Sequence, residues 1–195
     1  VGKTTTVTHD ALGRVWKTED PADGTSIVTY DAGGNVLYQQ SGLDQAWFEY
    51  DTLGRLALTR DVLDNETRYQ YVNFGEEILV TDAVNQVTRT RYDGYGRPVR
   101  TTEATGGVIV RAYNPVGDLL AITDQVGNIT QFTYDALGRL QTETDAFGTR
   151  TLTYDPAGNL VRRVDRNGRE IRWTYDALNR LTGEQWFDGG NVVRT

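Results

Sequence analysis

Tyr134-Asp135-Ala136-Leu137-Gly138-Arg139-Leu140 is the stretch of sequence that decides the fold of this chain. The stretch recurs, with few changes, as Tyr50-Asp51-Thr52-Leu53-Gly54-Arg55-Leu56 and as Tyr175-Asp176-Ala177-Leu178-Asn179-Arg180-Leu181. Looser copies begin at His9, Tyr30, Tyr71, Tyr92, Tyr113 and Tyr154, and successive copies start 20 or 21 residues apart. Because such a period is typical of repeat proteins, the sequence predicts one array of about nine repeats over residues 1–195.

Each repeat divides into two strands and two turns. Apolar and polar residues alternate over Ile129–Tyr134, as in a half-buried strand, and Asp135–Gly138 has the composition of a tight turn. Arg139–Thr144 is the expected return strand, and Asp145–Gly148 the second turn. Turns about every ten residues leave no room for an ordinary helix, so we expect about nineteen strands of six to eight residues and no helix.

These elements predict an all-β fold. Consecutive strands joined by short turns form a continuous antiparallel meander, in which each repeat mainly contacts its neighbours. Twisted sheets of more than roughly ten strands usually curl or split, so we expect the meander to be wound into a spiral or curved sheet. Phe132 and Tyr134 lie two residues apart and therefore share a face; equivalent positions elsewhere predict a ladder of aromatic cross-strand pairs.

Composition limits the classes of function. The formal net charge of −7, with acids and arginines interleaved, disfavours a nucleic-acid partner. The absence of cysteine excludes disulfides and thiolate chemistry. No apolar run reaches membrane-spanning length. The chain begins at Val1 and contains no methionine, so we expect it to be a piece of a longer protein.

Candidate catalytic and cofactor residues each have a simpler structural explanation. Gly2-Lys3-Thr4-Thr5 resembles the end of a phosphate-binding loop, but it lacks the first glycine and is followed by a predicted strand. His9, the single histidine, occupies a tyrosine position of the repeat. Glu76 and Glu77 break the repeat pattern, but adjacent strand residues point to opposite faces and cannot form a catalytic pair. We therefore expect no catalytic residue, no cofactor and no metal.

Two binding functions stay open at this point. The Asp and Asn residues of the turns offer hard oxygen ligands for calcium, although their spacing matches neither an EF-hand nor the glycine-rich nonapeptide repeat. Trp16, Trp47, Trp173 and Trp186 could stack on sugar rings, although their irregular spacing suits packing within the repeats better than one binding groove.

The recurring Tyr-Asp-x-x-Gly-Arg-Leu resembles the YD repeat of Rhs-family proteins, and the resemblance covers essentially the whole chain. The copies at Tyr30-Asp31-Ala32-Gly33-Gly34-Asn35-Val36 and Tyr154-Asp155-Pro156-Ala157-Gly158-Asn159-Leu160 also match well. The copy at Tyr71 lacks the Asp, and Asn114 and Asn179 replace Asp and Gly. We expect the structural signature of the repeat to comprise Tyr30, Asp31, Gly34, Tyr50, Asp51, Gly54, Arg55, Tyr92, Asp93, Gly96, Arg97, Tyr134, Asp135, Gly138, Arg139, Tyr154, Asp155, Gly158, Tyr175, Asp176 and Arg180.

The resemblance implies a function that spacing alone does not. Similar proteins include bacterial polymorphic toxins, shell components of insecticidal toxin complexes, wall-associated proteins and teneurins, whose repeats form a hollow β-shell. We therefore expect a secreted or cell-surface, non-catalytic shell segment. Its expected partners are the rest of the same protein and an enclosed C-terminal effector polypeptide. The alternative is an adhesion or carbohydrate-binding module whose partner is a surface glycan.

Overall fold

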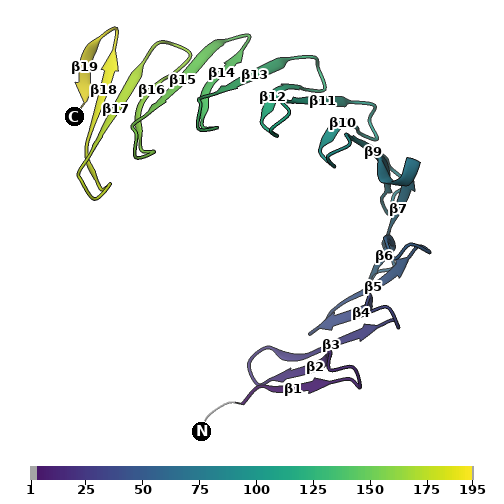
Figure 1. The fold of residues 1–195 in the computed structure, drawn as a ribbon. Helices are drawn as coiled ribbons and strands as arrows, with labels where there is room; N and C mark the ends of the chain where they lie inside the picture. The colour runs from purple at the N-terminus through teal and green to yellow at the C-terminus, as the bar shows by residue number, and fades with distance from the viewer. Residues whose placement is uncertain (1–3, 195) are drawn as a thin grey trace. The chain divides into compact units, whose positions relative to one another are not determined.

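A computed structural model describes residues 4–194, and these residues form an almost entirely β structure (Figure 1). The first strands in chain order are β1 (Thr6–His9), β2 (Val15–Asp20), β3 (Gly24–Tyr30), β4 (Val36–Ser41), β5 (Asp44–Tyr50), β6 (Leu56–Asp61), β7 (Glu66–Val72), β8 (Glu77–Thr81), β9 (Val87–Tyr92) and β10 (Pro98–Thr102). The remainder are β11 (Val108–Tyr113), β12 (Leu119–Thr123), β13 (Ile129–Tyr134), β14 (Leu140–Asp145), β15 (Gly148–Tyr154), β16 (Leu160–Val164), β17 (Glu170–Tyr175), β18 (Leu181–Asp188) and β19 (Asn191–Arg194). Gly2 and Lys3 of the sequence Gly2-Lys3-Thr4-Thr5 lie outside the described residues.

The chain divides into two units. The first contains Val1–Arg97 and Thr102–Thr105, and the second contains Pro98–Thr101 and Gly106–Thr195. In the first unit, each strand from β1 to β9 pairs antiparallel with the next in the chain. In the second, β11 to β19 pair in the same way. The expected all-β antiparallel meander is confirmed in both units.

The strands lie where the alternating pattern predicts them, although several are shorter than expected. β13 covers the predicted strand Ile129–Tyr134, but its return strand β14 begins at Leu140 and not at Arg139. The register between β13 and β14 shifts between Thr133 and Tyr134, as at a β-bulge. Arg139 therefore belongs to the turn and not to the ladder. The shortest strands, β1 and β19, have four residues each.

Each unit is a single-layer sheet. Leu58 and Ile171, exposed by 8% and 5%, are the only buried apolar side chains among residues 4–194, and none there is fully buried. A protein core normally forms between two packed layers of secondary structure. Neither unit has a second layer among the described residues, so neither has such a core. Stability must therefore come from the hydrogen bonds of the sheet, from side-chain pairs across strands and from the turns.

The predicted ladder of aromatic cross-strand pairs is wrong. The direct partner of Phe48 is Thr59, and those of Phe132 and Trp173 are Glu143 and Glu184. These aromatic positions lie on alternate strands, so a return strand separates each from the next by about 10 Å. Phe48, Phe132 and Trp173 therefore lie opposite polar residues of the return strand, whereas the repeat tyrosines, such as Tyr50 and Tyr134, lie opposite leucines.

One helical element corrects the expectation of no helix. The 3-10 turn η1 (Asn73–Gly75) connects β7 and β8 in the repeat that lacks the Asp. Asn73, Phe74 and Gly75 have φ values of 49°, 60° and 105°, and the Glu76 N–H donates to the Asn73 carbonyl at 3.2 Å. The aspartate turns contain an equivalent backbone hydrogen bond, but this turn has no Asp side chain to accept its other N–H groups.

Candidate functional site

The turn that follows each tyrosine has one recurring geometry, which Asp135–Arg139 illustrates. The Asp135 N–H donates to the Arg139 carbonyl at 2.9 Å, and the Gly138 N–H donates to the Asp135 carbonyl at 3.0 Å. Gly138 has φ of 76°, in the left-handed region that glycine adopts without a Cβ penalty. This arrangement is a type I turn followed by a glycine bulge, a common three-residue connection of a β-hairpin.

The Asp135 carboxylate ties this turn together. Its Oδ1 accepts hydrogen bonds from the N–H groups of Leu137 and Arg139 at 2.9 and 3.0 Å, and its Oδ2 accepts one from Arg139 Nε at 2.7 Å. Desolvation alone would raise the pKa of Asp135, but these hydrogen bonds to the charged form outweigh it, and the pKa lies below its usual value. The same Asp–Arg ion pair, with a shortest N–O distance of 2.7 Å, occurs at Asp10–Arg14, Asp51–Arg55, Asp93–Arg97 and Asp176–Arg180.

The turn arginine also contacts the next repeat. Arg139 Nη1 donates to the Asp155 carbonyl at 3.0 Å, and its guanidinium lies 4.7 Å from the centre of the Tyr154 ring. Arg14 repeats both contacts, with the Asp31 carbonyl at 3.1 Å and the Tyr30 ring at 4.5 Å. A guanidinium over an aromatic face is attracted by the ring quadrupole. One arginine therefore joins its own turn to the following repeat.

The repeat tyrosine makes a second connection between strands. Tyr134 Oη donates to the Leu119 carbonyl, at the first residue of the preceding return strand, at 2.9 Å. Five other tyrosines donate to the equivalent carbonyl at 2.8 to 3.1 Å: Tyr30 to Val15, Tyr50 to Val36, Tyr71 to Leu56, Tyr113 to Pro98 and Tyr175 to Leu160. We call the turn Asp, its Arg and the next repeat's Tyr the Asp–Arg–Tyr clasp.

Copies that depart from the motif preserve the turn by other donors. Asn35 and Asn159 replace the arginine, and each donates Nδ2 to the turn Asp, at 2.8 and 2.9 Å. In a third copy the roles are exchanged, because Asn114 accepts the turn N–H groups and donates to Asp118 at 2.8 Å. Asn179 replaces the glycine with φ of 60°, a conformation that Asn tolerates better than most residues.

The second turns use the same chemistry. Asp61, Asp82, Asp124 and Asp165 each accept hydrogen bonds from the N–H groups two and four residues later, at 2.8 to 3.0 Å. Asp64 and Asn85 take the left-handed position of two of these turns, with φ of 60° and 61°. These four second turns therefore use an aspartate carboxylate in the same way as the turns that follow the tyrosines.

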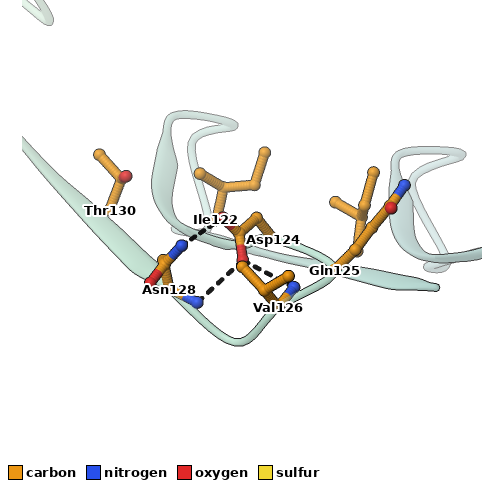
Figure 2. A pocket seen from close by; sticks show the side chains of 7 residues that line it. Ile122, Asp124, Gln125, Val126, Asn128 and Thr130 are labelled. Carbon is orange, nitrogen blue, oxygen red and sulfur yellow. Dashed lines mark hydrogen bonds between the residues drawn. The ribbon is translucent and has the colours of Figure 1, made fainter.

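A depression of about 340 Å³ lies beside one of these second turns, between β12 and β13 of the second unit (Figure 2). Ile122 and Thr130 form part of its wall, and Asp124 and Asn128 lie on the turn below them. Asp124 is fully engaged within the turn, since Oδ1 accepts two N–H groups and Oδ2 accepts Asn128 Nδ2 at 2.8 Å. Both oxygens of the Asp124 carboxylate therefore already bind groups of the turn, so the carboxylate is not available to orient a ligand.

A second depression, of about 410 Å³, lies over β16–β18 of the same unit. The register places Arg163 opposite Ile171, and Ile171 opposite Trp186, so the three side chains cross the sheet in one row on the same face. Buried Ile171 forms the floor. Glu184 accepts hydrogen bonds from Nε1 of Trp186 and from Nε1 of Trp173, the latter at 2.8 Å, which orients both indoles and lowers the pKa of Glu184.

The remaining candidates occupy structural positions. His9 is exposed at the end of β1. Glu77 pairs with Arg89 at 3.1 Å, whereas Glu76 ends the 3-10 turn. Trp47 is covered on one face by Tyr38, with ring centroids 5.2 Å apart, and Arg60 lies 5.1 Å from its ring.

Residues 4–194 also contain no candidate metal site and no candidate membrane-spanning helix. They contain no group of three or more His, Cys, Asp or Glu side chains placed to hold a metal ion. No helix in this described part of the chain has the length and apolar character needed to cross a membrane.

The predicted signature residues lie in these turns and at the strand ends that precede them. The tyrosines end β3, β5, β9, β13, β15 and β17, and the Asp, Gly and Arg residues follow in the connecting turns. Sequence reasoning did not find the contacts of Arg139 with the next repeat or those of Tyr134 with the preceding strand. The available signal was the joint recurrence of Tyr and Arg at a fixed spacing.

Comparison with known proteins agrees with this architecture. A family model described as RHS Repeat matches residues 113–150 and 154–185. No curated protein matched the chain. A crystal structure of TcdB2-TccC3-Cdc42 has a TM-score of 0.60 and 17% identity, and covers 98% of this chain. A structure of the Photorhabdus luminescens Tc holotoxin pore has a TM-score of 0.59, 18% identity and 98% coverage. A crystal structure of TcdB2-TccC3 without hypervariable C-terminal region has a TM-score of 0.59, 18% identity and 97% coverage. This chain spans 13% of the length of each of those chains, and at these identities the likeness concerns the fold.

Proposed function

We propose that this chain belongs to the RHS-repeat proteins, whose family model matches residues 113–150 and 154–185, and that it forms a non-catalytic segment of a secreted shell that encloses or presents a C-terminal effector polypeptide. We further propose that residues 1–195 act as a single repeat array in which the signature residues hold successive repeats together. The observation that carries the proposal is the Asp–Arg–Tyr clasp, because it uses the repeating polar residues to link repeats.

A wall-forming role accounts for features that an enzyme would not need. The carboxylates and guanidinia of the motif are engaged with one another and with backbone groups, which leaves them unavailable for proton transfer or substrate binding. Only Leu58 and Ile171 are buried among residues 4–194, so neither unit has a core in which a reactive group could be desolvated. Extended single-layer sheets suit the covering of a large area with few residues.

The solved structures support a larger assembly. Their chains are several times longer than this one, since it covers 13% of them, and one of these structures is of TcdB2-TccC3 without its hypervariable C-terminal region. We infer by analogy that a polypeptide C-terminal to these repeats is the enclosed partner.

Protease protection of the complete parent protein tests the proposal. Limited proteolysis should spare the polypeptide that follows the repeats in the unaltered protein. A variant with Asp10→Ala, Asp51→Ala and Asp135→Ala, which opens three clasps, should expose it. Equal digestion of that polypeptide in both proteins would contradict enclosure.

Carbohydrate binding is the second candidate, and the exposed indoles favour it. Trp16 and Trp186 are exposed by 38% and 37%, whereas Trp47 is covered by Tyr38 and Arg60. Titration with surface glycans should show saturable binding that Trp186→Ala abolishes and Trp47→Ala reduces less. Glycan binding that survives in the Trp16→Ala, Trp186→Ala double variant would show that these two indoles do not bind the glycan.

A further inference from the structure

We propose that the depression over Ile171 is a binding site for an apolar ligand that carries one carboxylate. The site lies wholly in the second unit, on one face of β16, β17 and β18. It does not depend on the proposed shell function, because the row Arg163–Ile171–Trp186 is formed by three neighbouring strands of one unit.

The floor and one wall of the site are apolar. Ile171 is exposed by only 5%, one of the two lowest values among residues 4–194. The indole of Trp186 stands beside it and Val193 of the C-terminal hairpin closes one side. Neighbouring strands are about 4.8 Å apart, so the row from Arg163 to Trp186 spans about 10 Å, enough for a ring or a branched aliphatic group.

Arg163 supplies the charge that selects the ligand. It is half-buried, and among residues 4–194 no hydrogen bond or close ion pair is found for its guanidinium, which lies 5.8 Å from the Trp173 ring and attracts the Glu184 carboxylate at longer range. Glu184, the nearby acid, is occupied by the two indole N–H groups. A half-buried guanidinium that donates no hydrogen bond within the described residues can donate charge-assisted hydrogen bonds to a ligand carboxylate.

The other charges around the site do not replace that carboxylate. Asp165 and Arg169 neutralise each other through a contact of 2.8 Å, and Asp165 Oδ1 also accepts two N–H groups of its turn. Asp188 lies at the exposed rim and disfavours a ligand with a second negative charge. The site therefore fits a monocarboxylate whose apolar part lies on Ile171 and Trp186.

The depression beside Asp124 is an internal comparison. It has a similar size and contains Ile122 and Ile109, but no arginine lines it, and Asp124 and Asn128 bond to each other. If apolar contact alone sufficed, both depressions would bind the same compounds. If the Arg163 guanidinium selects the ligand, only the depression over Ile171 will bind a carboxylate.

Methyl NMR of the chain labelled at isoleucine δ1 positions tests the proposal. Phenylacetate should shift the Ile171 signal saturably, with a dissociation constant on the order of 1 mM, and leave Ile122 unchanged. Neutral phenylacetamide should bind Ile171 at least tenfold more weakly, because it lacks the charge. N-acetylleucine, which resembles a polypeptide C-terminus, separates the two sources of such a carboxylate: tighter binding than phenylacetate indicates a peptide ligand, and weaker binding a small molecule.

Arg163→Gln should weaken phenylacetate binding by roughly tenfold or more while the other isoleucine signals keep their positions. Arg100→Gln is the control, since it removes the same charge from an exposed arginine that has no ion pair in the described chain and lies outside the site. Equal binding by the unaltered protein and Arg163→Gln, or an equal shift of Ile122, would overturn the proposal.

Discussion

Two turns of the first unit reverse the chain between antiparallel strands with different residues: Asp93–Arg97 after β9 and Asn73–Gly75 after β7. In the first, the Asp93 carboxylate accepts the N–H groups of Tyr95 and Arg97 at 2.9 and 3.0 Å, and one residue, Gly96, has positive φ. In the second there is no carboxylate, and three successive residues have positive φ. The period of the repeat survives in both.

The difference shows what the aspartate of the motif does. A carboxylate that accepts several N–H groups lets most of the turn keep ordinary backbone conformations. Without it, the chain reverses through a 3-10 turn that places Phe74 at φ of 60° with its ring fully exposed. Strand pairing of β7 with β8 imposes this less favourable turn.

Acid should have the largest effect on this comparison, because it acts on every aspartate turn at once. Hydrogen bonds from Arg97 and Tyr95 lower the pKa of Asp93, and similar bonds lower the pKa values of Asp51, Asp135 and Asp176. Groups with a depressed folded-state pKa stabilise the fold above their usual value of 3.8, and this stability is lost as pH falls through the folded pKa. Amide exchange at Arg97 should therefore accelerate below about pH 4 relative to Glu76, whose N–H bonds to a backbone carbonyl. An equal acceleration of exchange at both amides would show that protonation of the aspartates does not cause the loss of stability.

Asp93→Ala should have the next largest effect. The change removes three hydrogen bonds and the ion pair with Arg97, so we expect the melting temperature of the chain to fall by about 5 °C. Calorimetry is the measurement. Asp23→Ala is the control, since it removes the same charge from an exposed turn in which no hydrogen bond to the carboxylate is found among residues 4–194. A similar fall in both variants would assign the effect to net charge.

Gly96→Ala should destabilise the chain by about 1 kcal/mol, because an L-residue is strained at its φ of 76°. No atom lies within 4 Å of an added Cβ, so the cost is conformational and not steric. Gly94→Ala in the same turn also meets no atom within 4 Å, but Gly94 lacks a positive φ, so its replacement should be neutral or slightly stabilising. Urea unfolding of the two variants measures the difference, and equal destabilisation would refute the conformational explanation.

Phe74→Gly should have the smallest effect and the opposite sign. Glycine removes the strain at φ of 60°, and the exposed ring loses no packing, so we expect a stabilisation of about 0.5 kcal/mol. Urea unfolding again provides the measurement. Phe147→Gly replaces another exposed phenylalanine without positive φ and should destabilise the chain. If Phe74→Gly also destabilises it, strain is not a feature of the 3-10 turn.

The local parts of this structure could be predicted because their causes are local in sequence. Asp135 and Gly138 identify the turn through their own conformational preferences, and the alternation over Ile129–Tyr134 identifies the strand. The partners of Tyr134 and Arg139 could not be predicted in the same way. Their contacts with Leu119 and Asp155 depend on strand register and on the bulge that moves Arg139 out of the ladder.

The sequence by itself determined the repeat period, the antiparallel meander and the positions of the turns, because hydrophobic alternation and turn chemistry act within a few residues. Only the tertiary structure decided which side chains meet. Pairing of β16, β17 and β18 places Arg163, Ile171 and Trp186 in one row although they span 24 positions of the sequence. Such a row exists only when three strands adopt one register, and no residue in it carries that information alone.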